Sequence, residues 1–332
     1  MKQIKKILVP TDFSANAKFA LTHAQEIATR FDARIDLVHV IPTLKYFTES
    51  FESLESPLDN ADKELYPTVQ NETRQKLMAT MDEYFSDTSK GEAILRIERK
   101  ASQAIVELAE QNNYDLIVMP SKGRHGSHLL RGSTTDKVIR HSKVPVFNVD
   151  ERLSSEGLKQ ILIPTDGSSL SFSALPLALS LAYIYEATIT LYHVRELYGS
   201  RLEYENRNPQ KSEELNAYDE LIDCLNSYLT EEGLDHITLN GGEGDFENQF
   251  VVTDGASSHR IDCKTVIDKG FAAHQGIQEY ASEHADVVVM ATHGHSGLAH
   301  LLLGSTTEKV AQSLDLPVVT VKPKSGNFHD SK

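Results

Sequence analysis

Residues 5–40 read KKILVPTDFSANAKFALTHAQEIATRFDARIDLVHV, and residues 159–194 repeat this pattern as KQILIPTDGSSLSFSALPLALSLAYIYEATITLYHV. The two segments align without a gap, and 16 of the 36 positions are identical. Residues 132–149 and 304–321 form a second matching pair, in which 9 of 18 positions are identical. The offset between the copies grows from 159 − 5 = 154 to 304 − 132 = 172, so the second copy holds 172 − 154 = 18 additional residues. A repeat of this length predicts two domains of one fold.

Within each copy, short apolar runs alternate with longer stretches of helical periodicity. In the first copy the run Ile7-Leu8-Val9 ends at Pro10, and residues 15–30 then place small and apolar side chains on one helical face. The uninterrupted apolar run at residues 287–290 is typical of a strand that helices cover on both faces. The alternation predicts an α/β fold with a mainly parallel sheet in each half and helices on both faces of the sheet.

The repeat also predicts the domain organisation. We expect a first domain over residues 1–150, a linker over 151–158, a second domain over 159–323 and a tail over 324–332. The additional residues of the second copy, near 235–262, are rich in glycine and polar side chains. This composition indicates a surface loop or an added hairpin that pairs residues 237–239 with residues 250–253. Residues 170–185 are expected to form a single helix.

The composition excludes several classes of protein. The 332 residues include 33 Lys and Arg against 48 Asp and Glu, which gives a net charge of −15. A chain this acidic is repelled by nucleic acid and by anionic lipid. No apolar run reaches the ~18–20 residues that cross a bilayer, the N-terminus has no signal-peptide pattern, and only two cysteines are present. We therefore expect a cytoplasmic protein with no nucleic-acid partner and no membrane insertion.

Three features of each copy are expected to meet beyond the carboxyl ends of the strands, where open parallel sheets bind ligands. The first feature is a Pro-Thr-Asp strand end, the second is the end of the second strand, and the third is a glycine-rich loop before a helix. In the second copy these features comprise Pro164, Thr165, Asp166, Val194, Met290, Ala291, His293, Gly294, Gly304, Ser305 and Thr306. In the first copy they comprise Thr11, Asp12, Val40, Met119, Gly123, Gly132, Ser133 and Thr134.

The glycine-rich loops suggest a site for phosphate. Glycine lets backbone N–H groups converge on an anion, and the start of a helix adds unpaired donors and the positive end of its dipole. The hydroxyl groups of Ser305 and Thr306 could donate to phosphate oxygens as well. However, Ser305 and Glu308 have the spacing of a capping box, and Ser133 and Asp136 come close to it. Loop chemistry alone leaves phosphate binding and helix capping as alternatives.

The Pro-Thr-Asp strand ends, the Leu-x-His-Val second strands and the Met-x-x-x-Gly…Gly-Ser loops together resemble the universal stress protein family, in both halves of the chain. The resemblance implies two tandem Rossmann-like domains, each with a five-stranded parallel sheet. One branch of that family binds ATP through the pattern G-x2-G-x9-G-[S/T], whereas another branch lacks the pattern and is expected to bind no nucleotide. The last strand of each half, near residues 144–149 and 318–321, is expected at a sheet edge. By resemblance the two halves pair there as an intramolecular pseudo-dimer, and a homodimer of chains stays open.

The second copy keeps the spacing of the ATP pattern as Ala291-x2-Gly294-x9-Gly304-Ser305, with alanine in place of the first glycine. The resemblance implies that Asp166 lies near the ribose or the base and that the Val194 backbone meets the adenine edge. It places Gly294, Gly304, Ser305 and Thr306 along the phosphates of ATP with magnesium, or of AMP or ADP, while His293 approaches the phosphates or shapes the loop. The first copy departs further, because Pro120 lacks an N–H group and eight residues rather than nine separate Gly123 from Gly132.

The sequence therefore favours a nucleotide-dependent stress-response regulator, with its better site in the second domain and at most slow ATP hydrolysis. The alternative is a nucleotide-free protein that acts through protein contacts or an apolar ligand. An enzyme such as an adenylating ligase is disfavoured, because its Ser-Gly-Gly-x-Asp-Ser loop is missing. A metal site is disfavoured too, because the candidate ligands lack zinc-site spacing: His259, Cys263, His293, His295 and His300. His39 and His193 are expected to be structural, and Cys263 is either a quiet thiol or one activated by Lys264.

Overall fold

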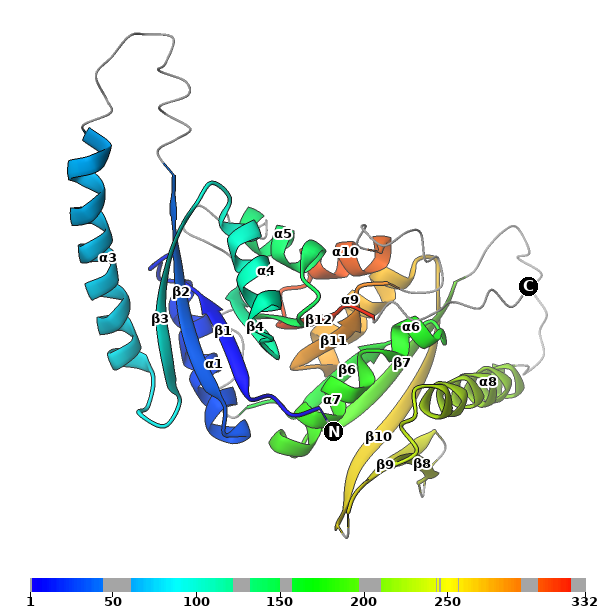
Figure 1. The fold of residues 1–332 in the computed structure, drawn as a ribbon. Helices are drawn as coiled ribbons and strands as arrows, with labels where there is room; N and C mark the ends of the chain where they lie inside the picture. Colours follow the sequence, from blue (N-terminus) through cyan, green and yellow to red (C-terminus); the bar gives the residue numbers. More distant parts are fainter. Residues whose placement is uncertain are drawn as a thin grey trace. The chain divides into compact units, whose positions relative to one another are not determined.

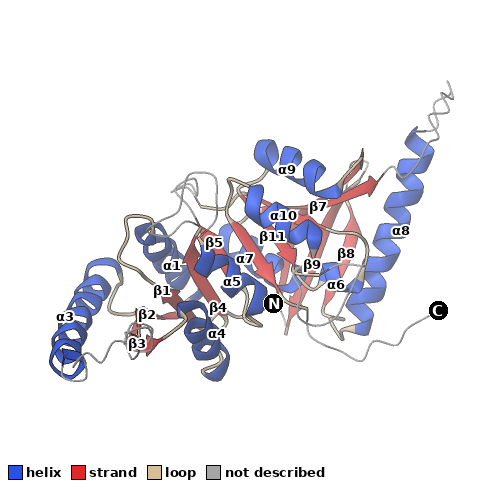
Figure 2. Ribbon diagram, turned by 90° about the horizontal axis from the view of Figure 1, so that it is seen from above, coloured by secondary structure: helices blue, strands red, loops and turns tan. Residues whose placement is uncertain are grey.

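The computed structural model describes residues 2–43, 61–121, 132–149, 157–196, 210–242, 244, 246–255, 257–293 and 304–323. The chain divides into two compact units, residues 3–151 and residues 152–332, which we call the first and the second domain. The predicted linker over residues 151–158 is described only from residue 157 onward. Most elements of each domain are labelled in Figure 1, and β5 is labelled in Figure 2.

The first domain contains one five-stranded sheet in which all strands are parallel. Its elements are β1 (Lys6–Pro10), α1 (Ala17–Phe31), β2 (Arg34–Pro42), α3 (Ala61–Tyr84), β3 (Lys90–Glu98), α4 (Ala101–Gln111), β4 (Leu116–Pro120), α5 (Ser133–His141) and β5 (Val146–Val149). The strand order is β3–β2–β1–β4–β5. Helices α1 and α3 lie on one face of the sheet and helices α4 and α5 on the other (Figure 2).

The second domain repeats this architecture and extends it. Its elements are β6 (Gln160–Pro164), α6 (Ser169–Phe172), α7 (Leu175–Tyr185), β7 (Thr188–Glu196), α8 (Gln210–Glu231), β8 (Ile237–Gly241), β9 (Glu247–Asp254), β10 (Ser257–Gly270), α9 (Ala273–His284), β11 (Val287–Ala291), α10 (Ser305–Ser313) and β12 (Val318–Val321). The strand order is β12–β11–β6–β7–β10–β9–β8. Helices α6, α7 and α8 cover one face of this sheet, whereas α9 and α10 cover the other (Figure 2).

The additional residues of the second domain form two antiparallel strands, so its sheet has seven strands rather than five. Strand β9 pairs with β8 and also with the first half of β10, and Ile237 lies opposite Val252 while Leu239 lies opposite Phe250. The predicted hairpin is therefore confirmed, and the predicted five parallel strands are present beside it. Helix α8 packs its buried residues, among them Leu225 and Tyr228, over this extension.

The predicted single helix over residues 170–185 is wrong, because the chain breaks between α6 and α7. The Ser168 hydroxyl caps the short helix α6 by accepting a hydrogen bond from the Ser171 N–H at 3.2 Å. Pro176 then stands in the first turn of α7. Proline has no N–H group to continue an earlier helix, but the first turn needs none. The helical periodicity on either side hides this interruption in the sequence.

Both cores bury the central strands and one face of each helix. Strands β1, β4, β6 and β11 are buried almost throughout. In the second domain, one cluster of buried side chains joins β6, β7 and β11 to α9 and α10, and it includes Leu162, Tyr192, Ile277, Met290 and Val310. Since parallel strands all end at the same edge of a sheet, this core positions the loops that follow β6, β7 and β11 beside one another.

Candidate functional site

A pocket opens in the second domain beyond the carboxyl ends of β6, β7 and β11. It encloses about 670 Å³ of empty space, part of which is open to solvent. Its walls are formed by Pro164, Thr165, Asp166, Ser171, Tyr192, Val194, Ala273, Ile277, Met290, Ala291, His293, Gly304, Ser305, Thr306 and Thr307. The structure thus brings together every second-domain residue that the sequence singled out, except Gly294, which lies outside the described residues.

The turn after β6 forms one wall of the pocket. The Thr165 N–H donates to the Tyr192 carbonyl oxygen at 2.9 Å, and Thr165 Oγ1 accepts from the Gly167 N–H at 3.1 Å. Asp166 is exposed, and its Oδ1 accepts hydrogen bonds from the Ser168 N–H at 3.1 Å and from Ser168 Oγ at 2.6 Å. Gly167 has φ +81°, a left-handed conformation that glycine adopts without strain. The tight turn therefore holds the Asp166 carboxylate at the pocket.

The end of β7 presents polar backbone to the pocket. Along a strand, alternate residues turn both N–H and C=O to the same side. The Tyr192 carbonyl points toward β6, where it accepts a hydrogen bond from the Thr165 N–H. The N–H and C=O groups of Val194 therefore point to the same side, but they lie beyond Pro164, the last residue of β6. His193 Nδ1 lies 2.9 Å from the Thr165 carbonyl oxygen, and because a carbonyl can only accept, Nδ1 carries the hydrogen. His193 is thus structural, as predicted, and the Val194 backbone forms a hydrogen-bonding edge of the pocket.

The inner end of the pocket is apolar. The Tyr192 hydroxyl donates to Asp268 Oδ2 at 2.8 Å and lies 3.1 Å from the Gly276 carbonyl oxygen, and its ring stacks on Tyr280 with centroids 4.6 Å apart. Burial and then the bond to Asp268 raise the pKa of Tyr192 well above its usual value. A Cβ atom at Gly276 would lie 3.1 Å from the Tyr192 hydroxyl oxygen, so the glycine gives the hydroxyl room. The ring is left as a wall beside Val194.

The outer end of the pocket is formed by the first turn of α10. Gly304 is the N-cap residue, its N–H donates to the Thr292 carbonyl oxygen at 2.8 Å, and no side chain caps this described helix. The first hydrogen bond within the helix runs from the Glu308 N–H to the Gly304 carbonyl oxygen at 2.8 Å. The N–H groups of the preceding residues, Ser305 to Thr307, are the helix-start donors that favour anions.

The capping-box alternative is wrong for both loops. Ser305 is the first residue of α10 rather than its cap, and its side chain is exposed. Ser133 holds the same place in α5, where Gly132 is the N-cap residue. The third residue of each helix has the structural hydroxyl: Thr307 Oγ1 donates to the Ala291 carbonyl oxygen at 2.8 Å and Thr135 Oγ1 to the Pro120 carbonyl oxygen at 2.9 Å. The Ser305 hydroxyl is therefore not committed to capping.

The first domain repeats the same framework. The Thr11 N–H donates to the Val38 carbonyl oxygen at 2.8 Å, and His39 Nδ1 donates to the Thr11 carbonyl oxygen at 2.7 Å. Asp12 Oδ1 accepts from the Ser14 N–H at 2.9 Å. Val40 and Met119 lie near the ends of β2 and β4, and Gly132, Ser133 and Thr134 begin α5, whereas Gly123 lies outside the described residues. Both domains thus build the same strand ends and the same helix start.

Four positions distinguish the two domains. Val38 aligns with Tyr192 at the offset of 154, and Pro120 occupies the place of Ala291. Helices α4 and α9 align at the offset of 172, where the buried pairs Ile105/Ile277 and Ala109/Ala281 coincide, so Ala104 matches Gly276. Phe13 takes the place of Gly167 with φ +59°, and its ring centroid lies 4.6 Å from that of His39. The first domain therefore lacks the tyrosine wall.

The other candidate groups of the sequence are cysteine and histidine side chains, which the structure describes in part. Cys263 is buried, and burial raises its pKa to about 12, so of the two alternatives the quiet thiol is confirmed and activation by Lys264 is not. The His259 ring packs on Tyr183 with centroids 4.4 Å apart. In the described ranges, no group of three or more His, Cys, Asp or Glu side chains is arranged to hold a metal ion. His295 and His300 lie outside these ranges.

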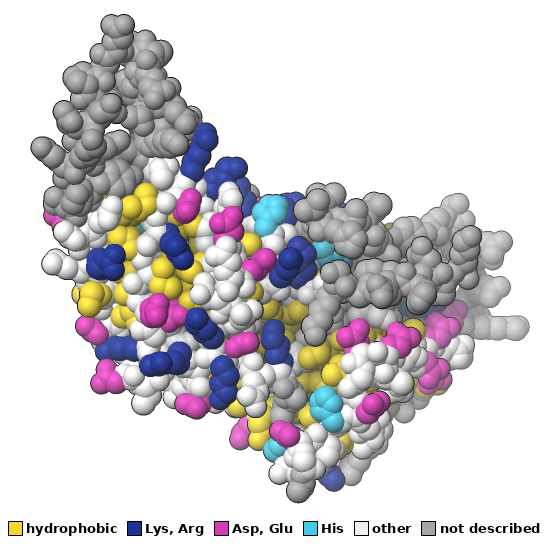
Figure 3. Space-filling model, viewed as in Figure 1, with side chains coloured by type: hydrophobic (Ala, Val, Ile, Leu, Met, Phe, Trp, Pro, Cys, Tyr) yellow, Lys and Arg dark blue, Asp and Glu magenta, His cyan; other side chains and the backbone are white. Residues whose placement is uncertain are grey.

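The surface agrees with the acidic composition. Acidic side chains are spread along the exposed side of α8, including Glu213, Asp219, Glu220 and Asp223 (Figure 3). The acidic pair Glu213-Glu214 is thus part of this helix, with Glu213 exposed and Glu214 half-buried. Among the helices that the structure describes, none has both the length and the apolar character to cross a membrane.

Five lining residues were not predicted from the sequence: Ser171, Tyr192, Ala273, Ile277 and Thr307. Tyr192 looks like an ordinary buried strand residue, and only its place two residues before Val194 puts it in the pocket. Ala273 and Ile277 are four residues apart and so share a face of α9, but which face turns toward the pocket depends on packing.

Comparisons with known proteins agree with the repeat. A model of the universal stress protein family matches residues 3–149 and again residues 157–322. A universal stress protein of Mycolicibacterium smegmatis is 24% identical over 321 residues, which cover 96% of this chain and 97% of that protein. The universal stress protein MJ0577 of Methanocaldococcus jannaschii is 29% identical over 158 residues, which cover 45% of this chain and 97% of the relative. The crystal structure of a universal stress protein from Archaeoglobus fulgidus superimposes with a TM-score of 0.58 at 20% identity, covering 97% of this chain and 99% of that one.

Proposed function

The chain belongs to the universal stress protein family, and from that premise we propose that its second domain binds an adenine nucleotide, ATP with magnesium, so that the protein acts as a nucleotide-dependent regulator in a stress response. The observation that carries the proposal is the pocket, which joins an apolar end, a hydrogen-bonding backbone edge, a carboxylate and the open start of a helix. An adenine base, a ribose and a chain of phosphates can each bind to one or more of these features.

The residues fit the parts of the nucleotide. The apolar end beside Tyr192 and Met290 suits a flat aromatic base, and the N–H and C=O of Val194 suit its hydrogen-bonding edge. Asp166, held by Ser168, suits the ribose hydroxyl groups. The first turn of α10 with the Ser305 hydroxyl suits the phosphates. When bound, ATP would supply a highly charged polyphosphate that can order or release the groups around it.

The pocket is better suited to holding a nucleotide than to hydrolysing it. The Asp166 carboxylate accepts two hydrogen bonds from Ser168 on one oxygen, and His293 Nδ1 shares a hydrogen bond of 2.9 Å with Thr292 Oγ1. A general base must reach an attacking water, and these bonds turn Asp166 Oδ1 and His293 Nδ1 toward neighbouring protein groups rather than toward such a water. Any hydrolysis is therefore expected to be slow.

The rest of the proposal concerns the whole chain. The first domain is the weaker nucleotide site, because Pro120 offers no N–H group beside its loop. We extend to this chain the expectation that its two domains pair as a pseudo-dimer, with a homodimer of chains as a further arrangement. A cytoplasmic location is supported by the small number of cysteines, because the chain has only Cys224 and Cys263 and no disulfide joins them.

A second candidate function is supported by the apolar inner end of the pocket. Tyr192, Val194, Ala273, Ile277 and Met290 would also suit a small apolar ligand without phosphates. Such a ligand would gain nothing from the first turn of α10. The two functions therefore differ in whether phosphates strengthen binding.

Isothermal titration calorimetry of the full chain tests the proposal. Wild-type protein with magnesium is expected to bind one equivalent of ATP tightly, and AMP more weakly because it places fewer phosphates at α10. Native mass spectrometry should detect nucleotide carried through purification. Absence of heat with ATP at high protein concentration, together with nucleotide-free mass spectra, would remove the nucleotide function and favour the apolar ligand.

A further inference from the structure

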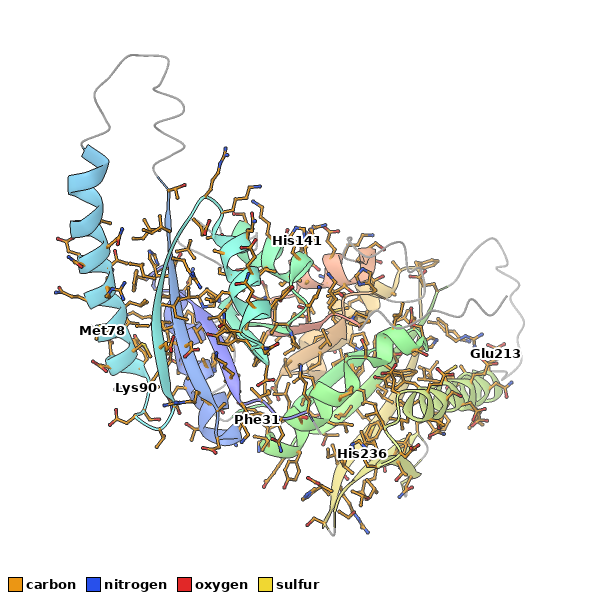
Figure 4. The ribbon with its side chains drawn as sticks, in the orientation of Figure 1. Phe31, Met78, Lys90, His141, Glu213 and His236 are labelled. Carbon is orange, nitrogen blue, oxygen red and sulfur yellow. The ribbon has the colours of Figure 1, made fainter. Side chains whose placement is uncertain are left out.

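Phe271 is a large apolar side chain that the fold leaves in water. It is 84% exposed, more than any other large apolar side chain in the described ranges. The next is Met78 at 54%, on the outer side of α3 (Figure 4). Phe271 lies between the last residue of β10, Gly270, and the N-cap residue of α9, Ala272.

The backbone around Phe271 is held firmly. Gly270 lies opposite Glu196 in the pairing of β10 with β7, and the Ala273 N–H donates to Glu196 Oε1 at 2.8 Å. Lys269 forms an ion pair with Glu213 of α8, which is labelled in Figure 4, and its Nζ lies 2.9 Å from Glu213 Oε2. Glu196 thus binds the chain on both sides of Phe271. The exposure of the ring is a property of a fixed position and not of a loose segment.

This fixed position borders the apolar end of the pocket. A Cβ atom at Gly270 would lie 3.4 Å from Val194 Cγ1, so the backbone just before Phe271 passes close to a pocket residue. Ala273, two residues after Phe271, lines the pocket itself. The Phe271 backbone therefore lies between a residue beside the Val194 side chain and a residue that lines the pocket.

We propose that Phe271 is the outer contact of the bound nucleobase and stacks on it from the rim, so that the base lies between this ring and the apolar wall of the pocket. The inference rests on the proposed nucleotide site. Aromatic rings stack on any base, with an effect on binding that depends on the base and not on the phosphates. In the first domain the matching position, two residues before the first residue of α4, is Arg99. An aromatic ring at this position is therefore specific to the second domain.

The chain contains no tryptophan, so Phe271→Trp creates a single fluorescent reporter at the rim. Titration with ATP and magnesium is expected to quench and shift its emission, whereas inorganic tripolyphosphate leaves it nearly unchanged. Tyr183→Trp is the matched control, because Tyr183 is 39% exposed on α7, on the opposite face of the sheet from α9. The emission of Tyr183→Trp is expected to stay unchanged with ATP and with tripolyphosphate. The inference would be overturned if both tryptophan variants responded equally to ATP. It would also be overturned if Phe271→Trp gave no response while calorimetry detected ATP binding.

Calorimetry of Phe271→Ala gives the second test. We expect ATP affinity to fall about 5- to 150-fold, the range that corresponds to removal of a stacking ring, while Phe271→Tyr binds like wild type. The melting temperature of the ligand-free protein should stay unchanged, because the side chain is exposed. If Phe271→Ala bound ATP with the same affinity as wild type, only the stacking contact would be overturned. Failure of the wild type to bind ATP would instead overturn the nucleotide site on which it rests.

Discussion

The described residues that flank the loops after β4 and β11 share a hydrogen-bonded framework in the two domains, but they differ at the last residue of the strand. In both, Thr135 or Thr307 bonds to the last strand carbonyl, and glycine caps the following helix. Ahead of the helix, however, Pro120 stands where the second domain has Ala291. The comparison teaches that the hydrogen bonds of the framework serve the fold. The binding properties depend on a few positions that the framework leaves free.

The inner walls differ in a correlated way. The second domain combines the large Tyr192 with Gly276, whereas the first domain combines the smaller Val38 with Ala104. A methyl group at Gly276 would lie 3.1 Å from the Tyr192 hydroxyl oxygen, so the glycine accommodates the larger side chain with the least crowding. Beside the pocket, Phe271 of the second domain aligns with Arg99 of the first domain. These differences make the second domain the one with an aromatic-lined site.

The strongest test of this asymmetry introduces a negative charge at the two helix starts. Ser305→Asp is expected to weaken ATP binding by about 3 kcal/mol or more, at least about a hundredfold, because the carboxylate repels the phosphates. The helix itself should tolerate the change, since an acidic residue in the first turn interacts well with the dipole. Calorimetry measures the affinity, and thermal unfolding checks that stability is kept.

Ser133→Asp is the matched variant in the first domain, where the residue is also exposed at the start of its helix. It is expected to leave the tight ATP site of the second domain intact. Equal loss of affinity in both variants would break the asymmetry, and a loss confined to Ser133→Asp would reverse it.

Replacing Tyr192 by the first-domain residue tests the inner wall. Tyr192 is 1% exposed, so Tyr192→Val removes most of a buried ring and is expected to destabilise the second domain by about 2–3 kcal/mol. Urea unfolding followed by circular dichroism measures the loss. Tyr183→Val, at a partly exposed tyrosine of the same domain, is the control and should cost clearly less. If the two variants unfold alike, Tyr192 is not the packed wall described above.

A smaller effect compares two buried tyrosine hydroxyls, one in each domain. The Tyr114 hydroxyl donates to Asp36 Oδ2 at 2.5 Å, and Asp36 is 5% exposed, whereas the Asp268 acceptor of Tyr192 is exposed. Removing a partner from a buried carboxylate costs more than removing one that water can replace. We expect Tyr114→Phe to cost about 2 kcal/mol and Tyr192→Phe about 1 kcal/mol in urea unfolding. The opposite order would contradict the burial of Asp36.

The smallest expected effect is a pH dependence, at alkaline pH, of the difference in unfolding free energy between wild type and Tyr192→Phe. Burial raises the pKa of Tyr192 above its usual value of 10.0, so the stability that its neutral form provides is complete below pH 10. Above pH 10 the unfolded chain loses this proton while the folded chain keeps it, and stability falls by up to about 1.4 kcal/mol per pH unit. The variant lacks this loss, so its deficit against wild type should shrink between pH 8 and pH 10.5. A deficit that stays constant would show that the hydroxyl titrates normally when folded.

Much of this architecture can be predicted from the sequence because it depends on local patterns. The apolar run at residues 287–290 and the repeated Pro-Thr-Asp ends identify parallel strands, and strand ends identify the pocket. Capping could not be resolved in this way, because the roles of Gly304 and Ser305 differ by one residue and both fit a helix start. The break before Pro176 and the part played by Tyr192 depend on packing between elements distant in sequence, which no local pattern records.

The most direct measurement of the central claim is a crystal of the ligand-free protein soaked with ATP and magnesium. The account predicts density in the second domain, with the base beside the Val194 backbone and the phosphates at the start of α10 near Ser305. The base should lie under the Phe271 ring. Density confined to the first domain, or an empty second pocket at a saturating ATP concentration, would contradict the claim.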